Sequence, residues 1–149
     1  MTVRVLALDL GSKRIGVAIC DAEGRVATPV TTLERHRDRP RLLRELRDLV
    51  AEWDAEMVLL GLPIDLAGDV GPAAEAVLAE RDELIGALGV PVAVHDERFT
   101  TRIADRALRE RGDMDGRARR KVIDMTAATI ILQDWLDRGG ATAARSVTP

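Results

Sequence analysis

The sequence has one cysteine, no tyrosine, one phenylalanine and two tryptophans among 149 residues. A single cysteine cannot form an internal disulfide or a cysteine-based zinc cluster. We interpret Cys20, at the end of the apolar run Ile15 to Cys20, as a small buried hydrophobe. Aromatic residues make up only 2% of the chain, which disfavours a platform of aromatic side chains that stacks nucleobases.

Long apolar runs are also missing. The run Val3 to Leu10 is interrupted at Asp9, and none approaches the roughly 18 residues that a membrane-spanning helix needs. We therefore expect a soluble, cytoplasmic protein with no membrane partner. The length suits one domain with one core, predicted at 1–138, and the polar segment 139–149 is expected to be a mobile tail.

An excess of positive charge is lacking too, since the net charge is -3, and this disfavours nucleic-acid binding. The basic residues nevertheless gather in two stretches. The first holds Arg35, Arg37, Arg39, Arg41, Arg44 and Arg47; the second holds Arg98, Arg102, Arg106, Arg109, Arg111, Arg117, Arg119, Arg120 and Lys121. Either stretch could contact phosphates. For the first, a solvated helix face balanced by Asp and Glu is favoured, and for the second both interpretations stay open.

Three apolar runs rich in β-branched residues open the chain. They are Val3 to Asp9, Arg14 to Asp21 and Val26 to Leu33, separated by turns at Gly11-Ser12-Lys13 and Ala22-Glu23-Gly24. This pattern predicts a three-stranded antiparallel meander.

Helical and strand patterns then alternate. Helices are predicted at Pro40 to Trp53 and about Gly71 to Leu88, and strands at Glu56 to Leu62 and Pro91 to Glu97. Two more helices, Thr100 to Arg111 and about Arg117 to Arg138, precede the helix-stopping Gly139-Gly140. The order predicts an α/β protein with a mixed five-stranded sheet (βββαβαβα) flanked by helices, which is the RNase H-like order.

Acidic residues stand where apolar residues are expected. Asp9 ends a strand that is apolar on both faces, and such a strand is normally central and buried. A charge there is costly unless it is paired or binds a cation. We therefore interpret Asp9 as a residue that serves the chemistry of a site rather than the packing of the strand. The alternative is that Asp9 caps the Gly11 turn.

Asp96 and Glu97 end another strand at the carboxyl edge, where ligands gather. Alternation lets only one of them point into a shared site, and parity leaves open which.

Asp124 heads an apolar stripe on the last predicted helix. The stripe continues through Ala128, Ile131, Leu132 and Trp135, so it should face the sheet. A carboxylate there favours a cation partner, although an acid in an early helical turn is also stabilised by the helix dipole. Acids from two strand ends and one helix could form an oxygen-lined site for Mg²⁺ or Mn²⁺, which suits phosphoryl displacement.

Four segments resemble motifs of the YqgF/RuvX family, in the family's order. They are Leu8 to Ala18, Gly61 to Pro63, Asp96 to Thr101, and Lys121 to Asp124 leading into Ala128 to Leu132. The resemblance covers about Val5 to Gly139. It implies an RNase H-like fold, a metal-dependent nuclease activity in maturing the 5′ end of 16S ribosomal RNA, and a fold kinship with Holliday-junction resolvases.

The resemblance also implies the site residues. By position, the catalytic and metal-binding acids would be Asp9, Glu97 and Asp124, which selects Glu97 over Asp96. The expected nucleic-acid contacts are Lys13, Arg14, Arg98 and Thr100, joined by Arg119, Arg120 and Lys121 of the basic stretch. Binding should work through phosphates and shape. The expected partners are structured RNA (pre-rRNA) and the small ribosomal subunit, with the protein a monomer or homodimer. The segment Ile64 to Asp69 departs from the family at positions 65, 67 and 69, so the resemblance leaves its binding role open.

Other functions stay open. Asp9-Leu10-Gly11 also resembles the phosphate loop of actin-like and sugar kinases, which would predict an ATP-binding phosphotransferase, but those enzymes clamp the nucleotide between two domains. A catalytically silent RNase H-like module that binds nucleic acid or assists ribosome assembly is the second alternative, and a Holliday junction resolvase is a third. We interpret the lone strand histidine, His95, as structural rather than as a fourth catalytic group.

Overall fold

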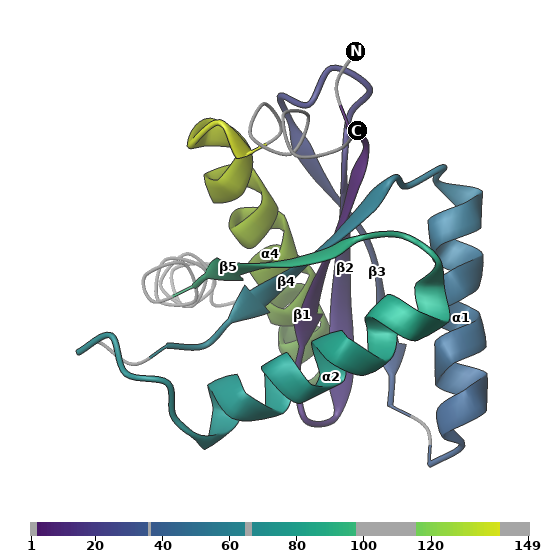
Figure 1. The fold of residues 1–149 in the computed structure, drawn as a ribbon, viewed down its shortest axis with the longest axis vertical. Helices are drawn as coiled ribbons and strands as arrows, with labels where there is room; N and C mark the ends of the chain where they lie inside the picture. The colour runs from purple at the N-terminus through teal and green to yellow at the C-terminus, as the bar shows by residue number, and fades with distance from the viewer. Residues whose placement is uncertain (1–2, 36, 65–66, 98–115, 141–149) are drawn as a thin grey trace.

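A mixed five-stranded sheet with strand order β3-β2-β1-β4-β5 forms the centre of the molecule (Figure 1). The computed structural model describes residues 3–35, 37–64, 67–97 and 116–140, with only the backbone described for 116–126. The strands are β1 (Val5–Leu10), β2 (Arg14–Cys20), β3 (Ala27–Glu34), β4 (Met57–Leu62) and β5 (Val92–Asp96). The helices are α1 (Arg39–Glu52), α2 (Pro72–Leu88) and α4 (Gly116–Asp137).

The first three strands form the predicted antiparallel meander. Leu8 of β1 lies opposite Val17 of β2, and β2 pairs with β3 through an irregularity between Val17 and Ala18. The strands β4 and β5 then extend the sheet in parallel on the other side of β1. β1 is therefore central, and residues 5–8 are fully buried, as its two apolar faces predict.

Helices cover both faces of the sheet because alternate residues of β1 point to opposite sides. Leu6 and Leu8 belong to a core with Leu42 of α1 and Leu84 of α2. Ala7, between them, belongs to a second core with buried residues of α4, namely Ala128, Ile131, Leu132 and Leu136. The apolar stripe predicted on the last helix is thus confirmed from 128 onward.

The helix ends follow local chemistry. The side chain of Asp38 accepts the backbone N–H of Arg41, 3.2 Å away, and so caps α1 one residue before Arg39. Gly89 ends α2 in the left-handed conformation, with φ of 72°.

Several predicted bounds need small corrections. β1 begins at Val5 rather than Val3, α1 begins at Arg39 rather than Pro40, and β5 ends at Asp96, so Glu97 lies one residue beyond the strand. Backbone hydrogen bonding sets the ends of these elements, and the pattern of apolar residues alone does not show where that bonding stops. The predicted helix Thr100 to Arg111 and positions 141–149 of the predicted tail lie outside the described residues.

Cys20 is buried as predicted, and its Sγ accepts the backbone N–H of Val5 at 3.1 Å. In the part of the chain that the structure describes, no helix combines the length and apolar character needed to cross a membrane.

Candidate active site

Three parallel strands end at one edge of the sheet and bring two of the predicted acids together there. Asp9 lies in β1, paired with Gly16 of β2. Glu97 directly follows β5, and its backbone N–H donates to the carbonyl of Leu62 in β4 at 3.1 Å. Because this bond continues the pairing of β5 with β4, Glu97 keeps a strand-like position.

Strand alternation places Asp9 and Glu97 on the face that α4 covers. Asp9 lies two residues after Ala7, which packs against α4. Glu97 lies two residues after His95, whose imidazole contacts Asp134 of α4. Asp96 therefore points to the opposite face. The geometry brings Glu97, rather than Asp96, to the side of Asp9.

A glycine makes room for the Glu97 carboxylate. A β-carbon at Gly61 of β4 would overlap Oε2 of Glu97 and lie 2.6 Å from Cδ1 of Ile131 in α4. Gly61 has no positive φ, so its backbone conformation does not demand glycine, whereas the space does. In the sequence, Gly61 stood out only as part of a family-like motif. A glycine inside a buried strand was the signal that another group approaches the backbone closely there.

The surroundings of Glu97 disfavour its charge. Burial, followed by the negative charges of Asp9 and Asp96, raises the pKa of Glu97 to about 7. Its Oε2 atom is buried. Asp9, Asp96 and Glu97 thus form a cluster of mutually repelling carboxylates at the edge of the sheet, where Glu97 is largely buried from water.

His95 has a well-defined partner on α4. Its Nε2 lies 2.7 Å from Oδ2 of Asp134, and Nε of Arg138 donates to the same oxygen at 3.0 Å. Burial opposes ionisation of Asp134, but the hydrogen bonds from His95 and Arg138 hold its pKa below the ordinary value. This contact joins β5 to α4, which agrees with the structural interpretation of His95.

The other predicted site residues are described only in part. Lys13 is exposed in the turn after Asp9, and Arg14 begins β2. Arg98 and Thr100 lie outside the described residues, and for Arg119, Arg120, Lys121 and Asp124 only the backbone, within α4, is described. Among the described residues, no group of three His, Cys, Asp or Glu side chains is placed to hold a metal ion.

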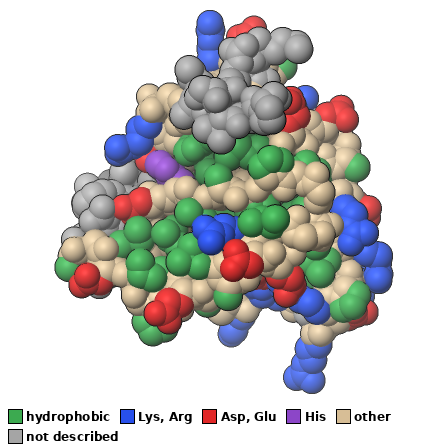
Figure 2. Space-filling view, viewed as in Figure 1, with side chains coloured by type: hydrophobic (Ala, Val, Ile, Leu, Met, Phe, Trp, Pro, Cys, Tyr) green, Lys and Arg blue, Asp and Glu red, His purple; other side chains and the backbone are tan. Residues whose placement is uncertain are grey.

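The first basic stretch is a mixed face rather than a basic surface. Arg39 pairs with Glu80 and Glu83, and Arg41 lies 3.5 Å from Glu45. In Figure 2, blue Lys and Arg side chains are interspersed with red Asp and Glu side chains along the side formed by α1. Acids thus balance the basic residues of this stretch, as the favoured interpretation predicts, but the side chains of Arg35, Arg39 and Glu80 are partly buried rather than solvated.

Comparisons with known proteins agree on the family and the fold. Residues 3–138 match the family RuvX, described as Holliday junction resolvase. Two curated relatives carry the name "Putative pre-16S rRNA nuclease". The protein of Moorella thermoacetica is 45% identical over 138 residues, which cover 93% of this chain and 97% of the relative. That of Chloroflexus aurantiacus is 42% identical over 142 residues, covering 95% and 92%.

Two solved structures share the fold at low sequence identity. RuvC of T. thermophilus in complex with a Holliday junction substrate has a TM-score of 0.55 at 16% identity, covering 93% of this chain and 98% of that chain. The fowlpox virus Holliday junction resolvase has a TM-score of 0.54 at 12% identity, covering 91% and 99%. With the mixed sheet of Figure 1, they confirm the predicted RNase H-like fold.

Proposed function

The chain belongs to the RuvX family, and on that premise we propose that it is a cytoplasmic nuclease that hydrolyses phosphodiester bonds in structured RNA, with the precursor of 16S rRNA as substrate. The names of its close relatives support this substrate. One observation carries the proposal: a partly buried carboxylate, Glu97, is held beside Asp9 where three parallel strands end. Ligand sites of open α/β sheets lie at such ends.

The pair Asp9 and Glu97 fits a divalent cation. Carboxylate oxygens are the donors that Mg²⁺ and Mn²⁺ prefer. A cation would also offset the repulsion from Asp9 and Asp96 that, together with burial, raises the pKa of Glu97. We assign Asp124 as the third ligand, as the family resemblance implies. Its backbone lies in α4 seven residues, or about two helical turns, before the buried Ile131. Mg²⁺ or Mn²⁺ held there would polarise the phosphodiester and help to activate water.

The remaining contributions come from the protein itself. Asp9 supplies acceptor oxygens from β1 and Glu97 from the residue after β5, and backbone hydrogen bonds to the neighbouring strands hold both residues in place. We assign phosphate binding to basic and polar residues around this edge, namely Lys13, Arg14, Arg98, Thr100, Arg119, Arg120 and Lys121. Phosphate contacts position the nucleic acid without reading its sequence.

A cleavage assay on defined RNA tests the proposal. The substrate is an RNA that joins the 5′ leader to the mature start of 16S rRNA, incubated with pure protein and Mg²⁺ or Mn²⁺. We expect products with a 5′-phosphate, because water attacks phosphorus and the 3′ oxygen departs. Asp9→Asn and Glu97→Gln should both abolish cleavage, whereas Asp82→Asn, which removes an exposed carboxylate from α2, should not.

Two results would argue against this function. Full activity in excess EDTA would exclude the metal site. Tight binding of the RNA without cleavage under any metal condition would favour the silent binding module, with the small ribosomal subunit as its natural partner.

A second candidate function is resolution of four-way DNA junctions, because the matching family is described as Holliday junction resolvase. The same acids would serve, since both reactions hydrolyse a phosphodiester. Parallel assays on the precursor RNA and on a synthetic four-way DNA junction, at equal salt, separate the two candidates.

A further inference from the structure

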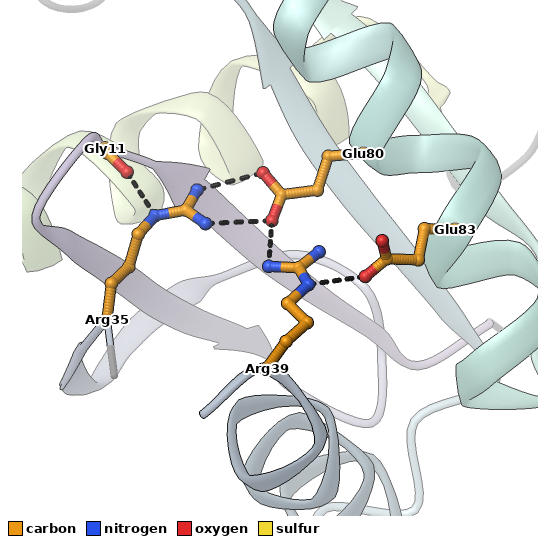
Figure 3. Close-up of polar contacts among 5 residues, drawn as sticks. All are labelled: Gly11, Arg35, Arg39, Glu80 and Glu83. Carbon is orange, nitrogen blue, oxygen red and sulfur yellow. Dashed lines mark hydrogen bonds and ion pairs between the residues drawn. The ribbon is translucent and has the colours of Figure 1, made fainter. Parts of the chain in front are cut away.

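Two arginines and two glutamates form an ion-pair network between the sheet and the helices α1 and α2 (Figure 3). Nη1 and Nη2 of Arg35 donate to the two carboxylate oxygens of Glu80, each at 2.9 Å. Arg39 donates from Nη1 to Glu80 at 2.8 Å and from Nε to Glu83 at 2.5 Å. Glu80 therefore binds both arginines, whereas Glu83 binds Arg39.

Arg35 also holds the turn between β1 and β2. Its Nε donates to the carbonyl of Gly11 at 2.5 Å, as Figure 3 shows, and its backbone N–H donates to the carbonyl of Lys13 at 2.9 Å. The turn is tight, because a β-carbon at Gly11 would lie 2.6 Å from the carbonyl oxygen of Arg14. Arg35 thus hydrogen-bonds to Gly11 and to Lys13, the two ends of the turn that follows Asp9 and Leu10.

Glu80 sets the direction of the Arg35 guanidinium. The group is planar, so two bonds from its Nη atoms to one carboxylate fix where Nε points. The side chains of Arg35 and Glu80 are only 20% and 14% exposed, which limits screening by water. Burial disfavours the charge on Glu80, but the hydrogen bonds from Arg35 and Arg39 lower its pKa below the ordinary value. The contact between Nε and Gly11 therefore depends on the carboxylate of Glu80.

We propose that Glu80 of α2 is a positioning residue for the β1–β2 turn, acting through Arg35, so that Lys13 and Arg14 meet nucleic-acid phosphates in a fixed arrangement. This inference rests on the proposed nuclease function. Asp9 itself is held by its pairing with Gly16. Loosening the turn should therefore weaken substrate binding more than the chemical step.

The chain offers a matched pair of variants. Glu80→Gln removes the charge that both arginines share, and Glu83→Gln removes a charge that contacts only Arg39 within the network. A role confined to packing α1 against α2 would make the two variants alike. Arg35→Lys is the second route: it keeps a positive charge near Gly11 but cannot bind a carboxylate through two parallel bonds, so it tests the same link if Glu80→Gln does not fold.

The first measurement is amide hydrogen exchange in the full chain, which needs no substrate. We expect Glu80→Gln and Arg35→Lys to speed exchange of the Arg35 amide, the donor to Lys13, by about tenfold relative to core strand amides. Glu83→Gln should leave that amide within about twofold of the original protein. Equal acceleration in Glu80→Gln and Glu83→Gln, or none in Glu80→Gln and Arg35→Lys, overturns the proposal.

The second measurement is steady-state cleavage of the precursor RNA described above. Glu80→Gln should raise KM by about tenfold with kcat changed by less than about twofold, because phosphate contacts bind the ground state and the transition state alike. A fall in kcat at constant KM would overturn the link to phosphate binding. If the original protein cleaves neither the RNA nor the four-way junction, the proposed function fails, while the exchange experiment still decides whether Glu80 positions the turn.

Discussion

Gly61 of β4 and the carboxylate of Glu97 lie so close that no side chain fits between them. A β-carbon at position 61 would overlap Oε2 of Glu97 on one side and lie 2.6 Å from Cδ1 of Ile131 on the other. The strand β4 is buried throughout, so neither its backbone nor the α4 helix can easily move away.

Gly61→Ala should therefore disturb the site and cost stability. Glu97 must rotate away from Asp9 or Ile131 must shift, and such overpacking costs about 1–3 kcal/mol of unfolding free energy. RNA cleavage should fall sharply. Urea denaturation and the cleavage assay measure the two effects. The matched control is Gly86→Ala at an exposed position of α2, where a β-carbon meets open space. This change should raise the unfolding free energy by up to about 1 kcal/mol. If Gly61→Ala is as stable and as active as Gly86→Ala, the close approach of Glu97 to Gly61 matters neither for stability nor for cleavage.

Stability of the metal-free protein should depend on the pH through Glu97. Its pKa rises from the ordinary 4.5 to about 7 on folding, so the folded state holds a proton that the unfolded state releases between these values. Protonated Glu97 therefore contributes to the unfolding free energy, and this contribution is fully present below pH 4.5 and is lost as the pH rises through about 7. The loss is roughly 1–3 kcal/mol. Glu97→Gln should flatten the curve of unfolding free energy between pH 4.5 and 7, measured in EDTA; parallel curves would contradict the assigned pKa.

Asp9→Asn should separate stability from activity. The substitution keeps shape and hydrogen-bonding capacity while removing a charge that raises the pKa of Glu97. We expect unchanged or higher stability in EDTA together with loss of cleavage. Added Mn²⁺ should stabilise the original protein more than the variant, by mass action. A purely structural carboxylate that caps the turn would instead cost about 0.5–2 kcal/mol on removal. A destabilised variant that still cleaves RNA would remove Asp9 from the metal site.

Phosphate binding by α4 is tested by Arg119→Ala combined with Arg120→Ala. Both residues lie in the helix that also carries Asp124. Affinity for the precursor RNA should fall, and the dependence of log Kd on log salt should lose about 1–2 units of slope, because fewer counterions are released. Arg44→Ala on α1 serves as the control. Unchanged affinity and slope in the double variant would place the RNA on another face.

Local pattern was enough to predict most elements of this protein. Alternation and β-branched runs located all five strands to within two residues, and the apolar faces of β1 indicated its central place. Parity could not choose between Asp96 and Glu97, because it does not show which face of β5 meets α4. The contact between His95 and Asp134 settles that face. Here the resemblance to a family had already selected Glu97.

The sequence by itself determined the order of strands and helices, the apolar stripe from Ala128 to Leu132, and the family, because these depend on residues close together in the chain or on motif spacing. Only the tertiary structure decided which distant residues meet. Arg35 and Glu80 are 45 residues apart in sequence, and the first basic stretch gives no sign that two of its arginines, Arg35 and Arg39, pair with glutamates on α2. Gly61 likewise acquires its meaning from Glu97 and Ile131, which reach it from two other elements. Such contacts follow from how the helices pack on a twisted sheet, and a pattern along one element carries no information about that packing.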